Sequence, residues 1–264
     1  MKYSDVYNRL KSDGKIAFVP FTMLGFPNYD MSLEIIKTII DNGADILELG
    51  FPFSDPVADG PIIQEANTIT LQNGFNTEKC FQLLSDIRKY SNIPIGLLVY
   101  GNLIYSYGIE KFYKRLHDLE INSILIPDIP PEECDDYLAA GNRNRVESVF
   151  IITPITPDNR LDMILERTSG FIYLISRLGV TGTHKSADQD LKAIVNKIKA
   201  RTSLPINVGF GISKPDHITT LKELQADGAI IGSAIIKLIK RNINDSIKLK
   251  TDLIDYITTI CKRK

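Results

Sequence analysis

Three acidic residues lie in one stretch that joins an apolar segment to a loop stiffened by proline and glycine. The stretch reads LELGFPFSDPVADGP over residues 47–61, with Glu48 inside the apolar run and Asp55 and Asp59 in the loop. Proline restricts its own backbone and that of the preceding residue, so the loop holds its acids in defined places. Carboxyls in unlike surroundings can serve as a general acid and a general base. We therefore interpret the stretch as an acid–base site.

Each acid also has an interpretation without chemistry. A carboxylate in an apolar strand is rarely fully buried unless it is paired, which favours a function for Glu48. Asp59 precedes a glycine, and Asp-Gly is a common turn pair, so local sequence leaves a turn former and a catalytic group equally open. Asp55 is predicted to be loop scaffolding. Asp128 could cap a helix that begins at Pro131 or line the site, and both interpretations stay open.

Three glycine-rich segments form a second chemical feature. They are GVTG at 179–182, GFG at 209–211, and Gly232-Ser233 at the start of a predicted helix. Backbone N–H groups in such turns and the amino end of a helix can bind phosphate. Each segment alone could be an ordinary turn, but their placement after three successive predicted strands favours a phosphate site.

Short apolar runs recur along the chain and predict the strands that position these residues. They alternate with amphipathic helical patterns. Because the runs are apolar on both faces, they indicate a buried parallel sheet. The eight predicted strands are 16–21, 46–49, 95–100, 123–126, 148–152, 171–175, 205–208 and 229–231.

The helical patterns carry signals for their ends. Asn28 or Asp30 can cap a helix whose apolar positions lie on one face, and Gly43 can end it. A short amphipathic helix is predicted within residues 1–14. The other helices are predicted at 77–90, 109–120, 131–140, 159–168, 188–201, 215–225, 233–240 and 246–261.

Eight strand–helix units without a break in composition favour an α/β fold, specifically a closed (β/α)8 TIM barrel. We expect residues 1–264 to form it as a single TIM-barrel domain, with an extra N-terminal helix and extra helices near the C-terminus. An open doubly wound sheet is the alternative, and it is weakened because no glycine-rich dinucleotide turn follows the first strand. In a barrel the site lies at the carboxyl ends of the strands, which is where Glu48, Asp59 and the glycine segments fall.

Composition narrows the class of protein further. Hydrophobic residues make up 44%, charged residues 24%, and the net charge is −1, which is typical of a soluble globular protein without affinity for nucleic acid. Cys80, Cys134 and Cys261 lack metal-site or disulfide spacing. No run approaches the roughly 20 apolar residues of a membrane span, and the first residues lack a signal-peptide layout. A cytoplasmic location is expected.

Residues 47–64, LELGFPFSDPVADGPIIQ, resemble the signature of the tryptophan synthase α subunit family. Further segments similar to the family follow in order: FTMLGFP at 21–27, PDIP at 127–130, YLISRLGVTG at 173–182, VGFGI at 208–212 and GSA at 232–234. The likeness covers essentially the whole chain, although residues 214–264 match little beyond Gly232-Ser233. Two departures are Leu178, where a small residue is common, and THKSA at 183–187, where relatives often carry a differently charged run.

This resemblance implies a lyase that splits indole-3-glycerol phosphate into indole and glyceraldehyde 3-phosphate, with no cofactor in this chain. It implies Glu48 and Asp59 as the catalytic residues. The residues implied for the phosphate are Thr181, Gly182, Gly211, Gly232 and Ser233. Those implied around the indole are Phe21, Tyr100, Leu125, Tyr173 and Phe210.

The resemblance also implies a partner, the β subunit of tryptophan synthase, which contains pyridoxal phosphate and receives the indole in an α2β2 tetramer. The segment 101–108 is apolar for a loop, so we expect it to contact that subunit or to pack on the barrel. Two other hypotheses remain. One is another phosphate-binding barrel enzyme of aromatic amino-acid biosynthesis, which would not need residues 47–61. The other is a non-catalytic barrel that activates the partner, which the presence of both acids disfavours.

The chemistry of the implied cleavage requires carboxyls in different states. Desolvation would keep Glu48 partly protonated, so that it donates a proton to indole C3 and then accepts one from the side-chain hydroxyl. Asp59, on a more solvated loop, would stay ionised and accept the indole N–H. The loops 51–61 and 179–187 are long enough to act as lids.

Overall fold

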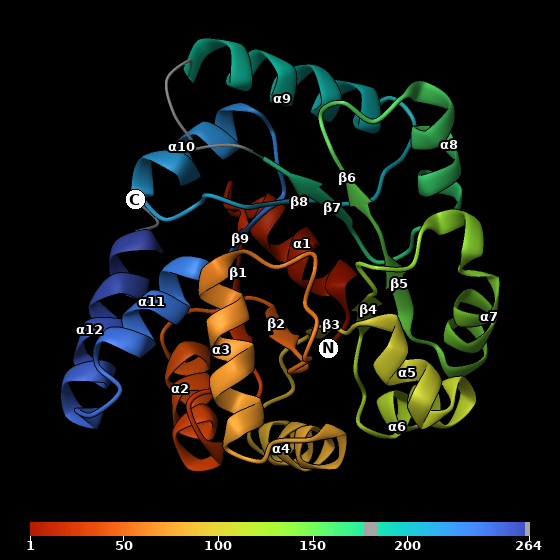
Figure 1. Cartoon of the computed structure of the whole chain (residues 1–264). Helices are drawn as coiled ribbons and strands as arrows, with labels where there is room; N and C mark the ends of the chain where they lie inside the picture. The colour runs from red at the N-terminus through yellow and green to blue at the C-terminus, as the bar shows by residue number, and fades with distance from the viewer. Residues whose placement is uncertain (177–183, 262–264) are drawn as a thin grey trace.

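The structure is a computed structural model that describes residues 1–176 and 184–261. Its strands are β1 (Ala17–Met23), β2 (Leu47–Gly50), β3 (Ile95–Leu98), β4 (Ser123–Leu125), β5 (Glu147–Val149), β6 (Ile151–Ile152), β7 (Ile172–Ile175), β8 (Ile206–Gly209) and β9 (Gly228–Ile231). They form one parallel sheet in the order β5-β4-β3-β2-β1-β9-β8-β7-β6. Helices surround this sheet (Figure 1), as expected for strands that are buried on both faces.

The predicted fifth strand is divided in two, and the division completes the barrel. β5 pairs with β4, β6 pairs with β7, and Phe150 lies between the two short strands. One segment of the chain therefore pairs with the neighbour on each side, so nine strands correspond to the eight predicted ones. The prediction of a (β/α)8 barrel is confirmed, and the open doubly wound sheet is wrong.

The helices largely follow the predicted pattern. Those before residue 100 are α1 (Tyr3–Ser12), α2 (Tyr29–Asp41), α3 (Pro61–Gln72) and α4 (Thr77–Tyr90). Next come α5 (Gly101–Tyr107), α6 (Ile109–Asp118), the 3-10 turn η1 (Pro131–Glu133), α7 (Asp135–Asn144) and α8 (Asp158–Arg167). The last are α9 (His184–Lys199), α10 (Pro215–Glu223), α11 (Ser233–Arg241) and α12 (Ser246–Ile260).

The structure differs from the predicted elements at four places. Residues 101–108 were expected to be a loop, but Gly101–Tyr107 form α5, and the helix α3 was not predicted. The helix expected at 131–140 is instead the turn η1 followed by α7. The loop expected at 179–187 is shorter, because α9 begins at His184, and its residues 179–183 lie outside the described residues.

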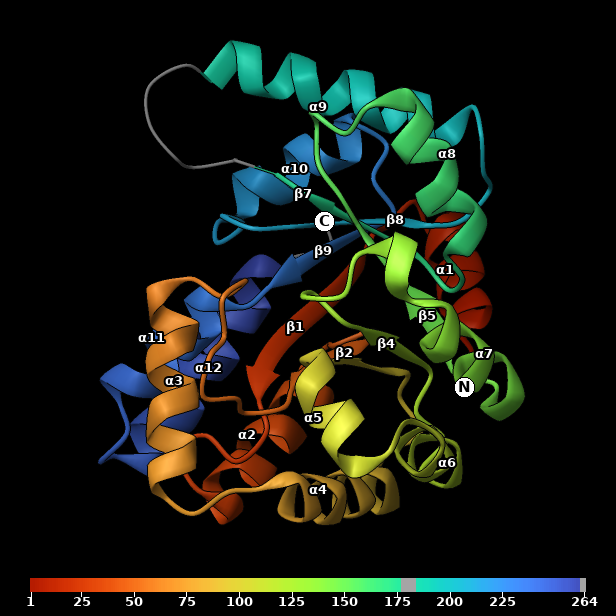
Figure 2. The same ribbon diagram turned by 45° about the vertical axis from the view of Figure 1, so that its right-hand side comes forward.

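Side-chain caps explain several helix starts. The Asn28 side chain accepts a hydrogen bond from the Met31 N–H at 3.0 Å, which satisfies one of the free donors at the start of α2. Asp245 caps α12 in the same way through the N–H of Lys248. The extra helices α11 and α12 lie beside α2 and α3 at the outside of the barrel (Figure 2).

The helix α1 covers the amino ends of the strands. The Tyr3 hydroxyl hydrogen-bonds the Ser123 hydroxyl at 2.7 Å, and the Tyr7 hydroxyl donates to Asn207 Oδ1 at 2.9 Å. Both rings are buried, and the ring of Tyr3 packs edge-on against Phe171. Two tyrosines thus join α1 to strands on opposite sides of the barrel, β4 and β8.

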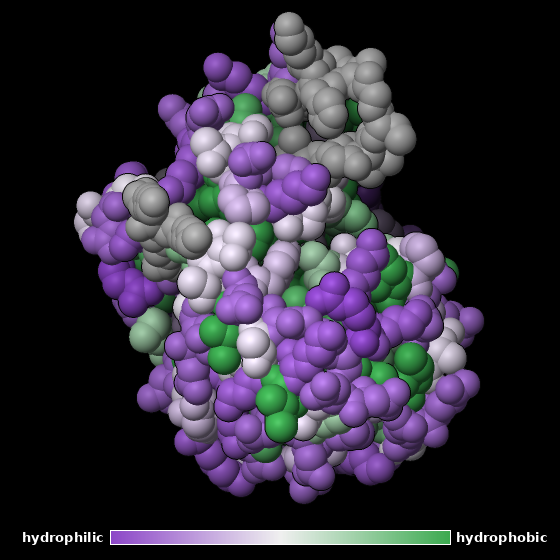
Figure 3. All heavy atoms as spheres, turned by 90° about the vertical axis from the view of Figure 1, so that its left-hand side faces the viewer, coloured by the Kyte–Doolittle hydropathy of each residue, from purple (hydrophilic) through white to green (hydrophobic). Residues whose placement is uncertain are grey.

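The surface view in Figure 3 shows mainly hydrophilic residues with scattered apolar ones. Within residues 1–176 and 184–261, no helix is long and apolar enough to cross a membrane.

Candidate active site

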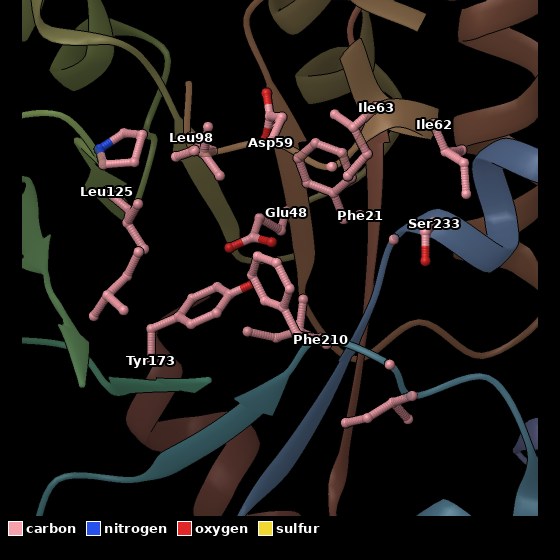
Figure 4. A pocket seen from close by; sticks show the side chains of 18 of the residues that line it. Phe21, Glu48, Asp59, Ile62, Ile63, Leu98, Leu125, Tyr173, Phe210 and Ser233 are labelled. Atoms are coloured by element: carbon pink, nitrogen blue, oxygen red, sulfur yellow. The ribbon is translucent and has the colours of Figure 1, made fainter. Parts of the chain in front are cut away.

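A mainly apolar pocket of about 240 Å³ lies at the carboxyl ends of the strands (Figure 4). It brings together residues that are far apart in the sequence, including both proposed catalytic acids. The predicted site residues that line it are Phe21, Glu48, Asp59, Leu125, Tyr173, Phe210, Gly211, Gly232 and Ser233. Thr181 and Gly182 lie outside the described residues.

Glu48 rises from β2 and is almost completely buried, with 4% of its surface exposed. Burial in this apolar pocket raises the pKa of its carboxyl to about 8, and the charge of Asp59 adds to the effect. Within the described residues the Glu48 carboxyl makes no hydrogen bond, and it lines the pocket, so its oxygens can meet a bound molecule. At neutral pH this side chain is mostly protonated and can act as an acid.

Asp59 lies on the loop that follows β2 and is half-buried. Partial burial raises the pKa of its carboxyl to about 6, while hydrogen bonds from Tyr100 and Asn67 act in the opposite direction. The side chain is therefore mostly ionised at pH 7, whereas Glu48 is mostly neutral. The two carboxyls differ in the predicted direction, which is the condition for an acid and a base in one site.

Tyr100 contacts Asp59 and the loop that carries it. It was expected beside the indole, but it is not among the residues that line the pocket. Its hydroxyl accepts a hydrogen bond from the Ala58 N–H at 3.1 Å and bonds to Asp59, and its ring stacks on Phe53 with centroids 4.9 Å apart. Tyr100 thus supports the loop that carries Asp59.

Two aromatic rings form the walls beside Glu48, and glycines give them room. A Cβ atom at Gly50 would lie 2.9 Å from Phe21 Cζ, and one at Gly209 would lie 2.7 Å from the Tyr173 hydroxyl. Any larger residue at either position would displace a ring from the pocket.

Several other lining residues were given no role at the site from the sequence alone. They are Ala58, Gly60, Pro61, Ile62, Ile63, Leu98, Pro127, Ile151, Ile212 and Ile230. Ile151 and Ile230 fall in predicted strands, so side-chain alternation was the available signal. Ile62 and Ile63 belong to α3, which was not predicted.

The glycine turn after β8 and the start of α11 lie on the same side of the pocket. Phe210 and Gly211 adopt left-handed backbone conformations, with φ of 70° and 80°. The Ser176 hydroxyl lies 3.0 Å from the Phe210 carbonyl oxygen and donates to it, which fixes this turn. Ser233 is the first residue of α11, so a helix amino end also borders the pocket. Such an end favours anionic groups.

The remaining acidic candidates lie outside the pocket. Asp128 accepts a hydrogen bond from the Gly101 N–H at 2.8 Å, so it caps α5 instead of the turn at Pro131. Asp55 is exposed and accepts a hydrogen bond from the Ser54 hydroxyl. In the part of the chain that the structure describes, no cluster of His, Cys, Asp and Glu could hold a metal ion.

The apolar residues of α5 mostly pack on the barrel. Ile104 is buried and Leu103 is half-buried, and the Tyr107 hydroxyl donates to Glu78. Tyr105 differs, because 71% of its surface is exposed. It offers an aromatic ring to solvent.

Comparison with known proteins gives one consistent result. The family model described as "Tryptophan synthase alpha chain" matches residues 7–262. The tryptophan synthase alpha chain of Methanothermobacter thermautotrophicus is 47% identical over 93% of this chain and 90% of its own length. That of Francisella tularensis (strain WY96-3418) is 41% identical over 97% and 96%.

Solved structures are similar to this chain over nearly its whole length. A protein of Aquifex aeolicus superposes with a TM-score of 0.88 and 34% identity, covering 98% of both chains. A chain of the α2β2 tryptophan synthase complex of Pyrococcus furiosus superposes with a TM-score of 0.85 and 31% identity, covering 95% of this chain and 98% of that one.

Proposed function

Because the chain belongs to the tryptophan synthase alpha chain family, we infer that it is the lyase that cleaves indole-3-glycerol phosphate to indole and glyceraldehyde 3-phosphate in tryptophan biosynthesis. The observation that carries this inference is one apolar pocket holding two carboxyls of different pKa, Glu48 near 8 and Asp59 near 6. The pocket suits a flat, apolar indole ring, and the carboxyls supply the proton transfers.

We propose a different catalytic role for each of the two acids. Glu48, protonated by desolvation, donates its proton to C3 of the indole as the bond to the glycerol side chain breaks. Its carboxylate then accepts the proton of the adjacent side-chain hydroxyl, which becomes the aldehyde of the product. Ionised Asp59 accepts a hydrogen bond from the indole N–H and stabilises the positive charge that develops on the ring.

The proposed binding residues divide between the two ends of the substrate. Phe21, Leu125, Tyr173 and Phe210 surround the indole, and their position around Glu48 in the pocket supports this assignment. The phosphate is proposed to bind backbone N–H groups at Gly211, Gly232 and Ser233, together with Thr181 and Gly182. A helix start and a left-handed turn on one side of the pocket support this second assignment.

The family uses no cofactor of its own. We propose that the chain works in an α2β2 tetramer with a β subunit that carries pyridoxal phosphate and receives the indole, as the α2β2 complex of Pyrococcus furiosus suggests. A cytoplasmic location and a single domain over residues 1–264 complete the proposal. One sheet with strands from both halves of the chain supports the single domain.

A direct assay tests the function. Indole-3-glycerol phosphate is added to the purified chain, alone and with a β subunit, and released indole is measured. We expect indole in both cases and more of it with the partner. The absence of indole in both would overturn the assignment.

A further inference from the structure

One buried amide connects both ends of the loop that carries Asp59. Asn67 lies in α3 with 1% of its surface exposed. Its Oδ1 accepts a hydrogen bond from the Phe53 N–H at 2.8 Å, at the start of the loop. Its Nδ2 donates to Asp59 Oδ2 at 3.3 Å, at the end of the loop, and to the Ile63 carbonyl oxygen at 3.0 Å.

These three bonds use both N–H groups of the amide and one lone pair of its oxygen. A carboxamide offers two donors and an acceptor, and Asn67 directs the acceptor at one end of the loop and a donor at the other. An aspartate of the same size could keep the bond from Phe53 but could not donate to Asp59. A buried polar group that loses its partner is destabilised, so the site tolerates few alternatives.

Besides Asn67, three titratable groups lie near the Asp59 carboxyl. Among the described residues these are the Glu48 carboxyl from β2, the Tyr173 hydroxyl from β7, and the Tyr100 hydroxyl after β3. Tyr100 and Asn67 are the two that donate hydrogen bonds to the carboxylate. Asn67 is the one that carries no ionisable proton, so its donation persists at every pH.

We propose that Asn67 is a positioning residue for the cleavage reaction, which orients the Asp59 carboxylate toward the pocket and keeps it ionised. The inference rests on the proposed role of Asp59. It extends the site to a residue outside the pocket wall, because Asn67 acts on the substrate through Asp59 and not by contact.

The aspartate variant separates this role from simple anchoring of the loop. Asn67→Asp retains an acceptor for the Phe53 N–H but places a second carboxyl beside Asp59 Oδ2. We expect the acid limb of the pH profile of kcat/KM to move upward by roughly one to two pH units, since a like charge and a lost donor both oppose ionisation. Asn67→Ala, which loses all three bonds, should shift it by roughly one unit. The alkaline limb should stay near its original place.

Two further variants make the outcome decisive. Thr70 lies one turn further along α3, and its buried hydroxyl donates to the Ala66 carbonyl oxygen at 2.7 Å. Thr70→Val removes this hydroxyl and should leave the profile unchanged. Circular dichroism and melting temperature show that each variant folds. If Asp59→Asn keeps normal kcat, the role of Asp59 itself fails. If Asp59→Asn is slow but the acid limb of Asn67→Asp coincides with that of the parent, Asn67 only anchors the loop and the inference is overturned.

Discussion

Phe21 and Glu48 are register partners on the adjacent parallel strands β1 and β2, so an aromatic ring and a buried carboxyl lie side by side in the pocket. Paired residues of neighbouring strands point to the same face of the sheet. The ring excludes water from the carboxyl, and the lack of a side chain at Gly50 lets the ring occupy that place. The raised pKa of Glu48 is thus a consequence of strand register.

Replacement of this carboxyl tests the proposed acid. Glu48→Gln should lower kcat for indole release by about 10²- to 10⁴-fold, because the amide cannot transfer a proton. Binding of inorganic phosphate, followed by calorimetry, should be unchanged. Glu147→Gln is the matched control, since Glu147 is a half-buried glutamate on β5 outside the pocket. Substantial turnover by Glu48→Gln would refute the assignment.

The two carboxyls also predict the pH profile of the reaction. Activity requires Asp59 ionised and Glu48 protonated, so it should rise through a pKa near 6 and fall through a pKa near 8. Values of kcat/KM for indole release, measured between pH 5 and 9 at substrate concentrations well below KM, report these pKa values of the free enzyme. A rate that keeps rising to pH 9 would show that Glu48 does not act as the acid.

Stability should depend on pH through the same glutamate. Its pKa is raised from 4.5 in the unfolded chain to about 8 in the folded one, so between these values the folded state binds more protons than the unfolded state. The free energy of unfolding must then fall as pH rises from about 4.5 to about 8. Urea titrations at pH 5 and pH 8 should show a smaller loss for Glu48→Gln than for the parent. Equal losses would contradict the burial of a titrating Glu48.

A charge at the start of α11 tests the phosphate site. Inorganic phosphate should raise the melting temperature of the parent, and Ser233→Asp should weaken this binding at least about tenfold, because a like charge close to the anion is repulsive. The substitution itself should not unfold the helix, since an acid is favourable at a helix amino end. Ser246→Asp, at the start of α12 and outside the pocket, is the control. Equal protection of both variants would place the phosphate elsewhere.

The exposed ring on α5 tests the partner surface. Tyr105→Glu should weaken association with the β subunit by about tenfold or more, because exposed aromatic residues often dominate an interface. Size-exclusion chromatography of the mixed chains measures the effect. Ile247→Glu changes a residue that is 82% exposed on α12 and should leave association intact. If both variants assemble like the parent, α5 does not contact the partner.

Periodic patterns predicted most of the fold. Apolar runs placed the strands within a few residues, and α4 begins and ends where its pattern does. The division of the fifth strand at Phe150 was not predictable, because it arises from pairing with two different neighbours. The helix α5 was missed since its residues are apolar on more than one face and its cap, Asp128, is distant in sequence.

The site was predictable where a residue type is unusual for its surroundings. Glu48 in an apolar strand is such a case. Asp59 was ambiguous in its Asp-Gly pair, and its place in the pocket and its contacts with Asn67 and Tyr100 distinguish it from a turn former. Asn67 itself gave no signal, because α3 was not predicted and an asparagine there is ordinary until its partners are known.

The two tyrosines of α1 determine the route by which substrate enters the pocket and products leave it. Tyr3 and Tyr7 are hydrogen-bonded to β4 and β8, so they close the end of the barrel opposite the pocket. Substrate and products then exchange through the face where the strands end, the same face that carries the Asp59 loop and borders α5. A protein bound to that face would control both the entry of indole-3-glycerol phosphate and the release of indole.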